Sequence, residues 1–255
     1  MGFLNRHSEA GTQPDAGAGL PAPGASSRCS PERRHALAGL LVRKECWQLS
    51  VRGKILALLI LVGALFAVHN SIYPWLAVTH RVSGQYLVVE GWIYNSGFKE
   101  AMAEFNKGGY RKILTSGCVV QDPLDFDGKV TYADWGAVRL RKLGMSKALV
   151  QPIPCWVEQK DRTYYSAVAV NEWFLTNHII VKSINVLTQG PHARRTRLLF
   201  QEAFGNEVKV GIIAVQDPAY DPKHWWRSSE GVRDVIGEGI AYLYAKFLFW
   251  PSSER

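Results

Sequence analysis

The sequence contains few cysteines, and none lies in a spacing that binds metal. Among its 255 residues there are four cysteines, too few for the disulfide framework of a small secreted domain. No Cys-x-x-Cys pair and no Cys/His spacing typical of zinc sites occurs, so we expect no metal site. The four are Cys29, Cys46, Cys118 and Cys155.

Three common motifs of ligand binding and catalysis are also absent. The sequence has no G-x-G-x-x-G dinucleotide fingerprint, no G-x-x-x-x-G-K-[ST] P-loop and no G-x-S-x-G nucleophile elbow. It therefore lacks the standard signatures of Rossmann dehydrogenases, P-loop nucleotidases and α/β-hydrolases. The sequence alone identifies no cofactor.

The positive charge is spread too evenly to indicate a nucleic-acid partner. The net charge is +8, of which residues 1–54 contribute half and the rest of the chain the other half. No basic stripe with interleaved aromatic residues occurs. We therefore expect no nucleic-acid partner.

The N-terminal segment has little apolar content. Residues 1 to about 35 are rich in Gly, Ala, Pro and Ser, so they bury too little surface to offset their ordering entropy. We expect residues 1–50 to form a disordered cytoplasmic N-terminus. Two alternatives remain open, a transit peptide and a translated upstream segment outside the mature protein.

A long apolar run follows, and it predicts one transmembrane helix over residues 51–78. Ile55 to Val68 is fourteen apolar residues without a charge. Extended to Val78, the helix would span about 36 Å, enough for a bilayer with some tilt. A buried core helix and a cleaved signal peptide are the alternatives.

The charges beside this run predict its orientation. Positive-inside logic places the basic N-terminal flank in the cytoplasm and residues 80–255 outside. We therefore expect an inner (plasma) membrane protein with a periplasmic or extracytoplasmic C-terminal domain. The near flank holds Arg43, Lys44, Arg52 and Lys54, and the far flank holds only Arg81.

Strand and helix patterns alternate from residue 82 to residue 250. Short apolar runs predict strands at 86–89, 112–115, 148–150, 184–187 and 208–215. Helical patterns lie at 97–107, 132–143, 162–175, 191–204 and 225–249. Apolar strands that each precede a helix predict a Rossmann-like three-layer α/β sandwich with a mostly parallel sheet of about five strands.

A basic stretch opens the helix after the fourth expected strand. Pro191 fits the first helical position. His192, Arg194 and Arg195 then fall in the first turn, where a helix N-terminus favours anions. Thr188 to Leu199 therefore predicts an anion-binding site, with a solvated basic turn as the alternative.

A second stretch, Glu158 to Ala167, opens the helix after the third expected strand. Asp161 can cap this helix, and the hydroxyls of Thr163 and Ser166 lie in its first turns. Arg162 could join Arg195 and His192 around a phosphate or carboxylate, with Glu158 or Asp161 orienting the cations. An ordinary polar helix start is the alternative.

Several segments near the strand ends have more than one interpretation. Ser116-Gly117 is a point where a backbone could approach a ligand. The long loop from Val119 to Val130 is typical of a functional lid. Cys118 and Cys155 follow strands at one rim and could pair in an oxidising compartment. Trp225-Trp226 could stack on a sugar or base, rest at a membrane interface or pack the last helix.

The order of these motifs resembles the YdcF-like family (ElyC/SanA/YdcF). The resemblance covers residues 82–250 and implies a Rossmann-like domain linked to bacterial envelope integrity and to peptidoglycan or lipid-carrier metabolism. It implies that the pocket is lined by Glu90, Ser116, Gly117, Arg162, Thr163, His192 and Arg195. It rests on Val88-Val89-Glu90-Gly91, Thr115-Ser116-Gly117, Asp161-Arg162-Thr163 with Ser166, His192-x-x-Arg195 and Arg233-Asp234.

These features favour a membrane-anchored envelope protein that binds, and could process, an anionic ligand such as a lipid-linked cell-wall or polysaccharide intermediate. His192 is the candidate catalytic residue. The alternative is a non-catalytic module for a nucleotide-like ligand of the S-adenosylmethionine type. The expected ligand-binding residues are Glu90, Gly91, Ser116, Gly117, Glu158, Asp161, Arg162, Thr163, Ser166, Arg194, Arg195 and Arg233.

Overall fold

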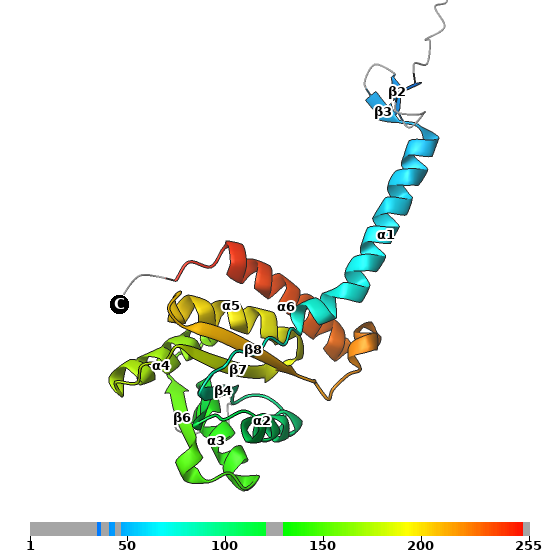
Figure 1. The fold of residues 1–255 in the computed structure, drawn as a ribbon. Coiled ribbons are helices and arrows are strands. Elements are labelled where there is room, and N and C mark those ends of the chain that lie inside the picture. The colour runs from blue at the N-terminus through cyan, green and yellow to red at the C-terminus, as the bar shows by residue number, and fades with distance from the viewer. Residues whose placement is uncertain (1–34, 37–40, 44–46, 121–129, 252–255) are drawn as a thin grey trace, which may run out of the picture. The chain divides into compact units, whose positions relative to one another are not determined.

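The computed structural model describes residues 35–36, 41–43, 47–120 and 130–251 (Figure 1). The chain divides into two compact units, Met1–Leu61 and Val62–Arg255, and we describe each by itself.

The first unit contains a small antiparallel sheet of three strands. These strands are β1 (His35–Ala36), β2 (Leu41–Arg43) and β3 (Trp47–Leu49), with β2 in the centre. They lie inside the segment 1–50 that composition predicted to be disordered, so the structure differs there. Backbone pairing between neighbouring strands holds this small sheet together. The expectation for residues 1–34 falls outside the described residues.

Helix α1 (Val51–Leu76) is long and apolar enough to cross a membrane. Its 26 residues give a length of about 39 Å. It ends two residues before the predicted boundary at Val78. Its final turn packs in the second unit, where Leu76 is fully buried with Tyr220, Trp225 and Val235.

The second unit is built on a five-stranded parallel sheet in the order β6-β5-β4-β7-β8. Most strand residues are buried because helices cover both faces, which explains the continuous apolar runs. The strands are β4 (Tyr86–Glu90), β5 (Lys112–Cys118), β6 (Val150–Cys155), β7 (Ser183–Gln189) and β8 (Lys209–Val215).

Four helices complete the two outer layers of the sandwich. Helices α2 (Asn95–Lys107) and α3 (Tyr132–Lys142) pack on one face through a core that includes Phe98. Helices α4 (Arg162–Thr176) and α5 (Ala193–Phe204) cover the opposite face. This confirms the predicted α/β sandwich, and the sheet is entirely parallel.

Two elements differ most from their predicted bounds. Strand β6 begins at Val150 and continues through Pro152 and Pro154, because an edge strand tolerates residues without an N–H donor. The expected helix 225–249 is instead a short 3₁₀ helix, Pro222–Arg227, followed by α6 (Ser229–Phe247). Ser228 separates them, since its side chain accepts a hydrogen bond from Gly231 N and caps α6.

The strand order determines where a ligand can bind. From β4 the chain proceeds outward to β5 and β6, then crosses back to β7 on the other side of β4. The carboxyl ends of β4 and β7 therefore flank the topological switch point, where open α/β sheets bind their ligands. Glu90 ends β4 and Gln189 ends β7.

Candidate functional site

A cavity of about 550 Å³ lies at these strand ends. Segments after four of the strands contribute to its wall, together with α6. Eight of the residues predicted from the sequence line it, which places two separate stretches of the chain in one site. They are Glu90, Gly117, Asp161, Arg162, Thr163, Ser166, His192 and Arg195.

Glu90 is a buried carboxylate between β4 and the start of α5. Its Oε2 accepts hydrogen bonds from Thr188 Oγ1 and, at 3.5 Å, from Thr196 Oγ1. The same oxygen lies 3.7 Å from His192 Nε2. Two hydroxyls and an imidazole therefore surround this carboxylate, and they offset part of the cost of burying it.

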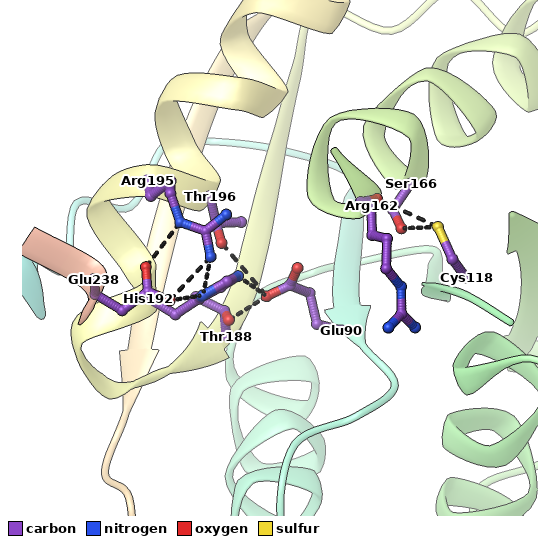
Figure 2. Close-up of polar contacts among 9 residues, drawn as sticks. All are labelled: Glu90, Cys118, Arg162, Ser166, Thr188, His192, Arg195, Thr196 and Glu238. Carbon is purple, nitrogen blue, oxygen red and sulfur yellow. Dashed lines mark hydrogen bonds and ion pairs between the residues drawn. The ribbon is translucent and has the colours of Figure 1, made fainter. Parts of the chain in front are cut away.

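His192 is held on its other side by Glu238 of α6 (Figure 2). The two are joined through His192 Nδ1 and Glu238 Oε1, 2.8 Å apart. Arg195 donates to both oxygens of this carboxylate, at 2.8 Å from Nε and 2.9 Å from Nη2. The ring of Trp92 packs edge-on against the imidazole, with centroids 4.9 Å apart.

Glu238 is the electrostatic centre of this network. Burial by itself raises the pKa of Glu238, but His192 and the hydrogen bonds from Arg195 outweigh burial and hold the pKa well below its ordinary value. Burial likewise lowers the pKa of Arg195, yet its pairing with Glu238 outweighs this and raises the pKa. Both groups therefore stay charged in the folded protein over the physiological pH range.

This pairing assigns distinct roles to the two ring nitrogens of His192. Nδ1 is engaged by two charged groups, Glu238 Oε1 at 2.8 Å and Arg195 Nη2 at 3.0 Å. Nε2 is buried and makes no hydrogen bond within the described residues. It faces Glu90 and is the nitrogen that remains for proton transfer.

Arg162 forms the opposite side of the cavity. Its Nη2 donates to Val119 O at 2.7 Å, and its guanidinium lies 5.5 Å from the centroid of the Tyr132 ring. Among the described residues it makes no ion pair with a carboxylate. Asp161 precedes it as the helix N-cap with φ 57°, but its side chain makes no capping hydrogen bond, unlike the prediction.

A disulfide joins the two cysteines at the cavity rim. Cys118 and Cys155 occupy paired positions at the ends of the adjacent strands β5 and β6 and are bonded to each other. Ser166 Oγ lies 3.3 Å from the sulfur of Cys118. The disulfide therefore links the end of β5 to the end of β6, just below the start of α4.

Five residues expected in the site do not line this cavity. Gly91 lies against the backbone of Tyr132, and Ser116 is buried, with no hydrogen-bond partner for its hydroxyl among the described residues. Arg194 instead packs over Trp75, 4.3 Å from its ring centroid, and donates to the Trp75 carbonyl. The other two are Glu158, which is exposed, and Arg233, which pairs with Glu230 at 3.7 Å on the surface of α6.

Sequence reasoning missed the aromatic side of the site and Glu238. Tyr164, Tyr244 and Phe249 form a cluster at the cavity, with the Tyr164 and Phe249 centroids 5.2 Å apart. Tyr244 near the end of α6 and Phe249 just after this helix were the available signal for the cluster. Glu238 had no local signal, because its partners lie on another helix.

A smaller cavity of about 140 Å³ lies behind the His192–Glu238 pair. It is lined by Asp217 and Asp234 as well as Glu238. Burial, followed by the charges of Asp217 and Glu238, raises the pKa of Asp234. Within the described residues, no group of three or more His, Cys, Asp or Glu side chains is arranged to hold a metal ion.

Comparison with known proteins assigns no family to this arrangement. No protein-family model matches the chain, and no curated protein sequence matches it. The resemblance to the YdcF-like family therefore stays a prediction. The geometry of the cavity and the properties of α1 are the basis for the function that follows.

Proposed function

We propose that this protein is a membrane-anchored envelope protein that binds the anionic head group of a lipid-linked saccharide intermediate. The observation that carries the proposal is the cavity at the switch point, with a buried histidine between two carboxylates. Buried charges are costly unless paired, and titratable groups in such surroundings cluster at functional sites. The resemblance to the YdcF-like family supports the same class of ligand.

The proposed membrane location rests on α1 and its flanks. The helix has a mean hydropathy of 2.3 in its most apolar window. The basic residues before it favour an N-terminus in the cytoplasm and a domain outside the inner membrane. The Cys118–Cys155 disulfide supports this orientation, because such bonds persist in oxidising compartments.

Arg162 is the group that would bind the phosphates of the ligand. Arg195 is engaged by Glu238, whereas Arg162 has no carboxylate partner among the described residues. A guanidinium binds phosphate oxygens in a bidentate manner. The aromatic cluster of Tyr164, Tyr244 and Phe249 offers an apolar surface for a saccharide ring or an isoprenoid chain.

His192 would process the bound ligand by moving a proton. Glu238 orients the ring through Nδ1, which leaves Nε2 to accept or donate a proton towards the cavity. Glu90, 3.7 Å away, stabilises the protonated ring. The proton then passes between Nε2 and a phosphate oxygen or a sugar hydroxyl of the ligand.

A binding measurement on the full chain in nanodiscs tests the proposal. The probes are farnesyl pyrophosphate, a short-chain polyprenyl-pyrophosphoryl saccharide, inorganic pyrophosphate and uncharged farnesol. Saturable binding of the pyrophosphate lipids and much weaker binding of farnesol are expected. R162A should weaken binding by about 10-fold to 100-fold, as expected for a charge-assisted contact.

Arg233→Ala is the matched control, because it removes an exposed arginine outside the cavity. Its side chain is 74 % exposed, and the variant should bind like the wild type. Equal affinity for farnesol and farnesyl pyrophosphate, or full binding by R162A, would overturn the proposal. H192A should bind the probe but lose any turnover of the saccharide.

A second candidate is a non-catalytic site for a nucleotide-like ligand such as S-adenosylmethionine. The observation in its favour is that the cavity wall contains as many acidic as basic residues. The acidic residues are Glu90, Asp161 and Glu238. Carboxylates bind ribose hydroxyls, and Trp92 could stack on a base. Calorimetry with S-adenosylmethionine separates the candidates, since only this one expects saturable heat without turnover.

A further inference from the structure

Helix α6 presents an apolar stripe on the side opposite the cavity. The stripe is made of five residues, which fall within an arc of about 80° on a helix with 3.6 residues per turn. All five side chains are exposed, up to 65 % for Ile240 and 66 % for Phe247. The stripe consists of Val232, Ile236, Ile240, Leu243 and Phe247.

The composition of this stripe is typical of a helix that lies in a membrane interface. Within α6, all of which the structure describes, no charged side chain falls inside the arc. Arg233 and Lys246 flank it on either side, and Trp250 beyond the helix is 84 % exposed. Basic flanks attract anionic head groups, and tryptophan favours the interfacial region.

The stripe is next to the helix that can span the membrane. Ile72 of α1 lies against Gly239, where an added Cβ would be 3.7 Å from the Ile72 side chain. Trp75 packs edge-on against Tyr242, with ring centroids 5.0 Å apart. Gly239 is about 20° from the edge of the stripe on the helical wheel. The C-terminal part of α1 therefore borders the stripe, and α6 crosses that end of α1 (Figure 1).

We infer that α6 is an interfacial helix, whose apolar stripe lies in the outer surface of the bilayer that α1 spans. This occupant follows from the contact with α1, because a bilayer around α1 is the apolar phase closest to the stripe. A continuous stripe of five exposed apolar side chains would be unfavourable if it faced water.

This arrangement defines the route of a lipid-linked ligand, a consequence that rests on the proposed function. The opposite side of α6 lines the cavity through Glu238, Ala241 and Ala245. Tyr244 lies between the two sides and also lines the cavity, as does Phe249. A head group would enter the cavity beside Tyr244 while its lipid chain stays in the membrane.

Lipid quenching in proteoliposomes of the full chain tests the inference. Cys29 and Cys46 are replaced by serine, and one new cysteine carries a nitrobenzoxadiazole label at residue 236, 240 or 247. Labels at Leu175, near the C-terminal end of α4, and at Ile180, in the segment after this helix, are matched controls, because both are exposed apolar residues. A label at Leu65, near the middle of α1, reports insertion of the anchor through its quenching by phosphatidylcholine that carries a nitroxide deep in the acyl chain.

Phosphatidylcholine with a shallow nitroxide should quench the α6 labels roughly twofold, because such helices bury their apolar face about 5–10 Å into the interface. The labels at 175 and 180 should be unaffected. Quenching at residue 65 without quenching on α6 would overturn the inference and leave the anchor intact. No quenching at residue 65 would overturn both the anchor and the inference. If the α6 labels become protected from quenching as the protein-to-lipid ratio rises, the stripe contacts a second copy of the protein. That result would also overturn the inference.

Discussion

His192 and Glu238 are 46 residues apart in the chain and meet through Nδ1 and Oε1 at 2.8 Å. The contact joins the start of α5 to the middle of α6, so the last helix completes a site whose other residues follow the strands. It also distinguishes the two sides of α6, since one side holds the histidine and the other carries the apolar stripe. Changes to Glu238 should therefore affect both stability and the site.

Glu238→Gln should destabilise the protein by about 3 kcal/mol at neutral pH, because it leaves the buried Arg195 without its counter-charge. Thermal unfolding of the full chain in detergent measures this. Glu230→Gln is the control. Glu230 is exposed and pairs with Arg233 at 3.7 Å on the surface, so its loss should change the stability little. An E238Q variant as stable as the wild type would contradict an ion pair between Glu238 and Arg195.

The pH dependence of stability should change in the same variant. Glu238 has a lower pKa in the folded protein than its ordinary value of 4.5. Its contribution is therefore complete above pH 4.5 and is lost as the pH falls towards the folded-state pKa. The difference in melting temperature between E238Q and the wild type should accordingly shrink below pH 4.5, whereas a constant difference would argue against this titration.

Asp234→Asn should have the opposite effect. Burial, Asp217 and Glu238 raise the pKa of Asp234 above its ordinary value of 3.8, so the charged form opposes folding. The asparagine variant should melt at a higher temperature at pH 8. This gain should vanish below pH 3.8, where aspartate is protonated in both the folded and the unfolded protein. Melting curves from pH 3 to pH 8 measure both limits.

The fold was predictable from sequence because its signals are local. Continuous apolar runs predicted four of the five strands of the parallel sheet, whereas β6 shares only Val150 with its predicted range. Pro191 predicted the start of the segment that leads into α5. Residues that follow the strands directly, such as Glu90 and Arg162, could be assigned to one rim by the rule that ligands bind at the carboxyl ends.

The rest of the site depended on contacts that local patterns do not encode. Glu238 pairs with His192 only because α6 packs across α5. The Cys118–Cys155 bond required that β5 and β6 be neighbours, and strand order cannot be deduced from the apolar runs. Arg194 and Arg195 are adjacent in sequence, but one packs on Trp75 and the other enters the cavity.

Reduction of the disulfide should lower stability by up to about 4 kcal/mol, the chain-entropy value for a loop of this length. The two cysteines are 37 residues apart in the sequence. Unfolding with and without a phosphine reductant measures the effect, and C118S/C155S should match the reduced wild type. C29S/C46S should remain as sensitive to reductant as the wild type, so loss of that sensitivity would contradict the assignment.

Gly91→Ala should destabilise the protein by about 1–3 kcal/mol, the usual cost of overpacking. An added Cβ would lie 1.8 Å from the carbonyl oxygen of Tyr132 and 2.4 Å from its carbon. These are backbone atoms at the first residue of α3, so the helix start must move away from β4. Tyr132 lines the cavity under Arg162, so the binding of farnesyl pyrophosphate through Arg162 should weaken as well.

Gly237→Ala is the matched control, because nothing lies within 4 Å of its added Cβ. On the exposed side of α6 this change should stabilise by about 0.5–1 kcal/mol and leave binding intact. Equal melting temperatures for G91A and the wild type would show that Gly91 does not hold α3 against the sheet.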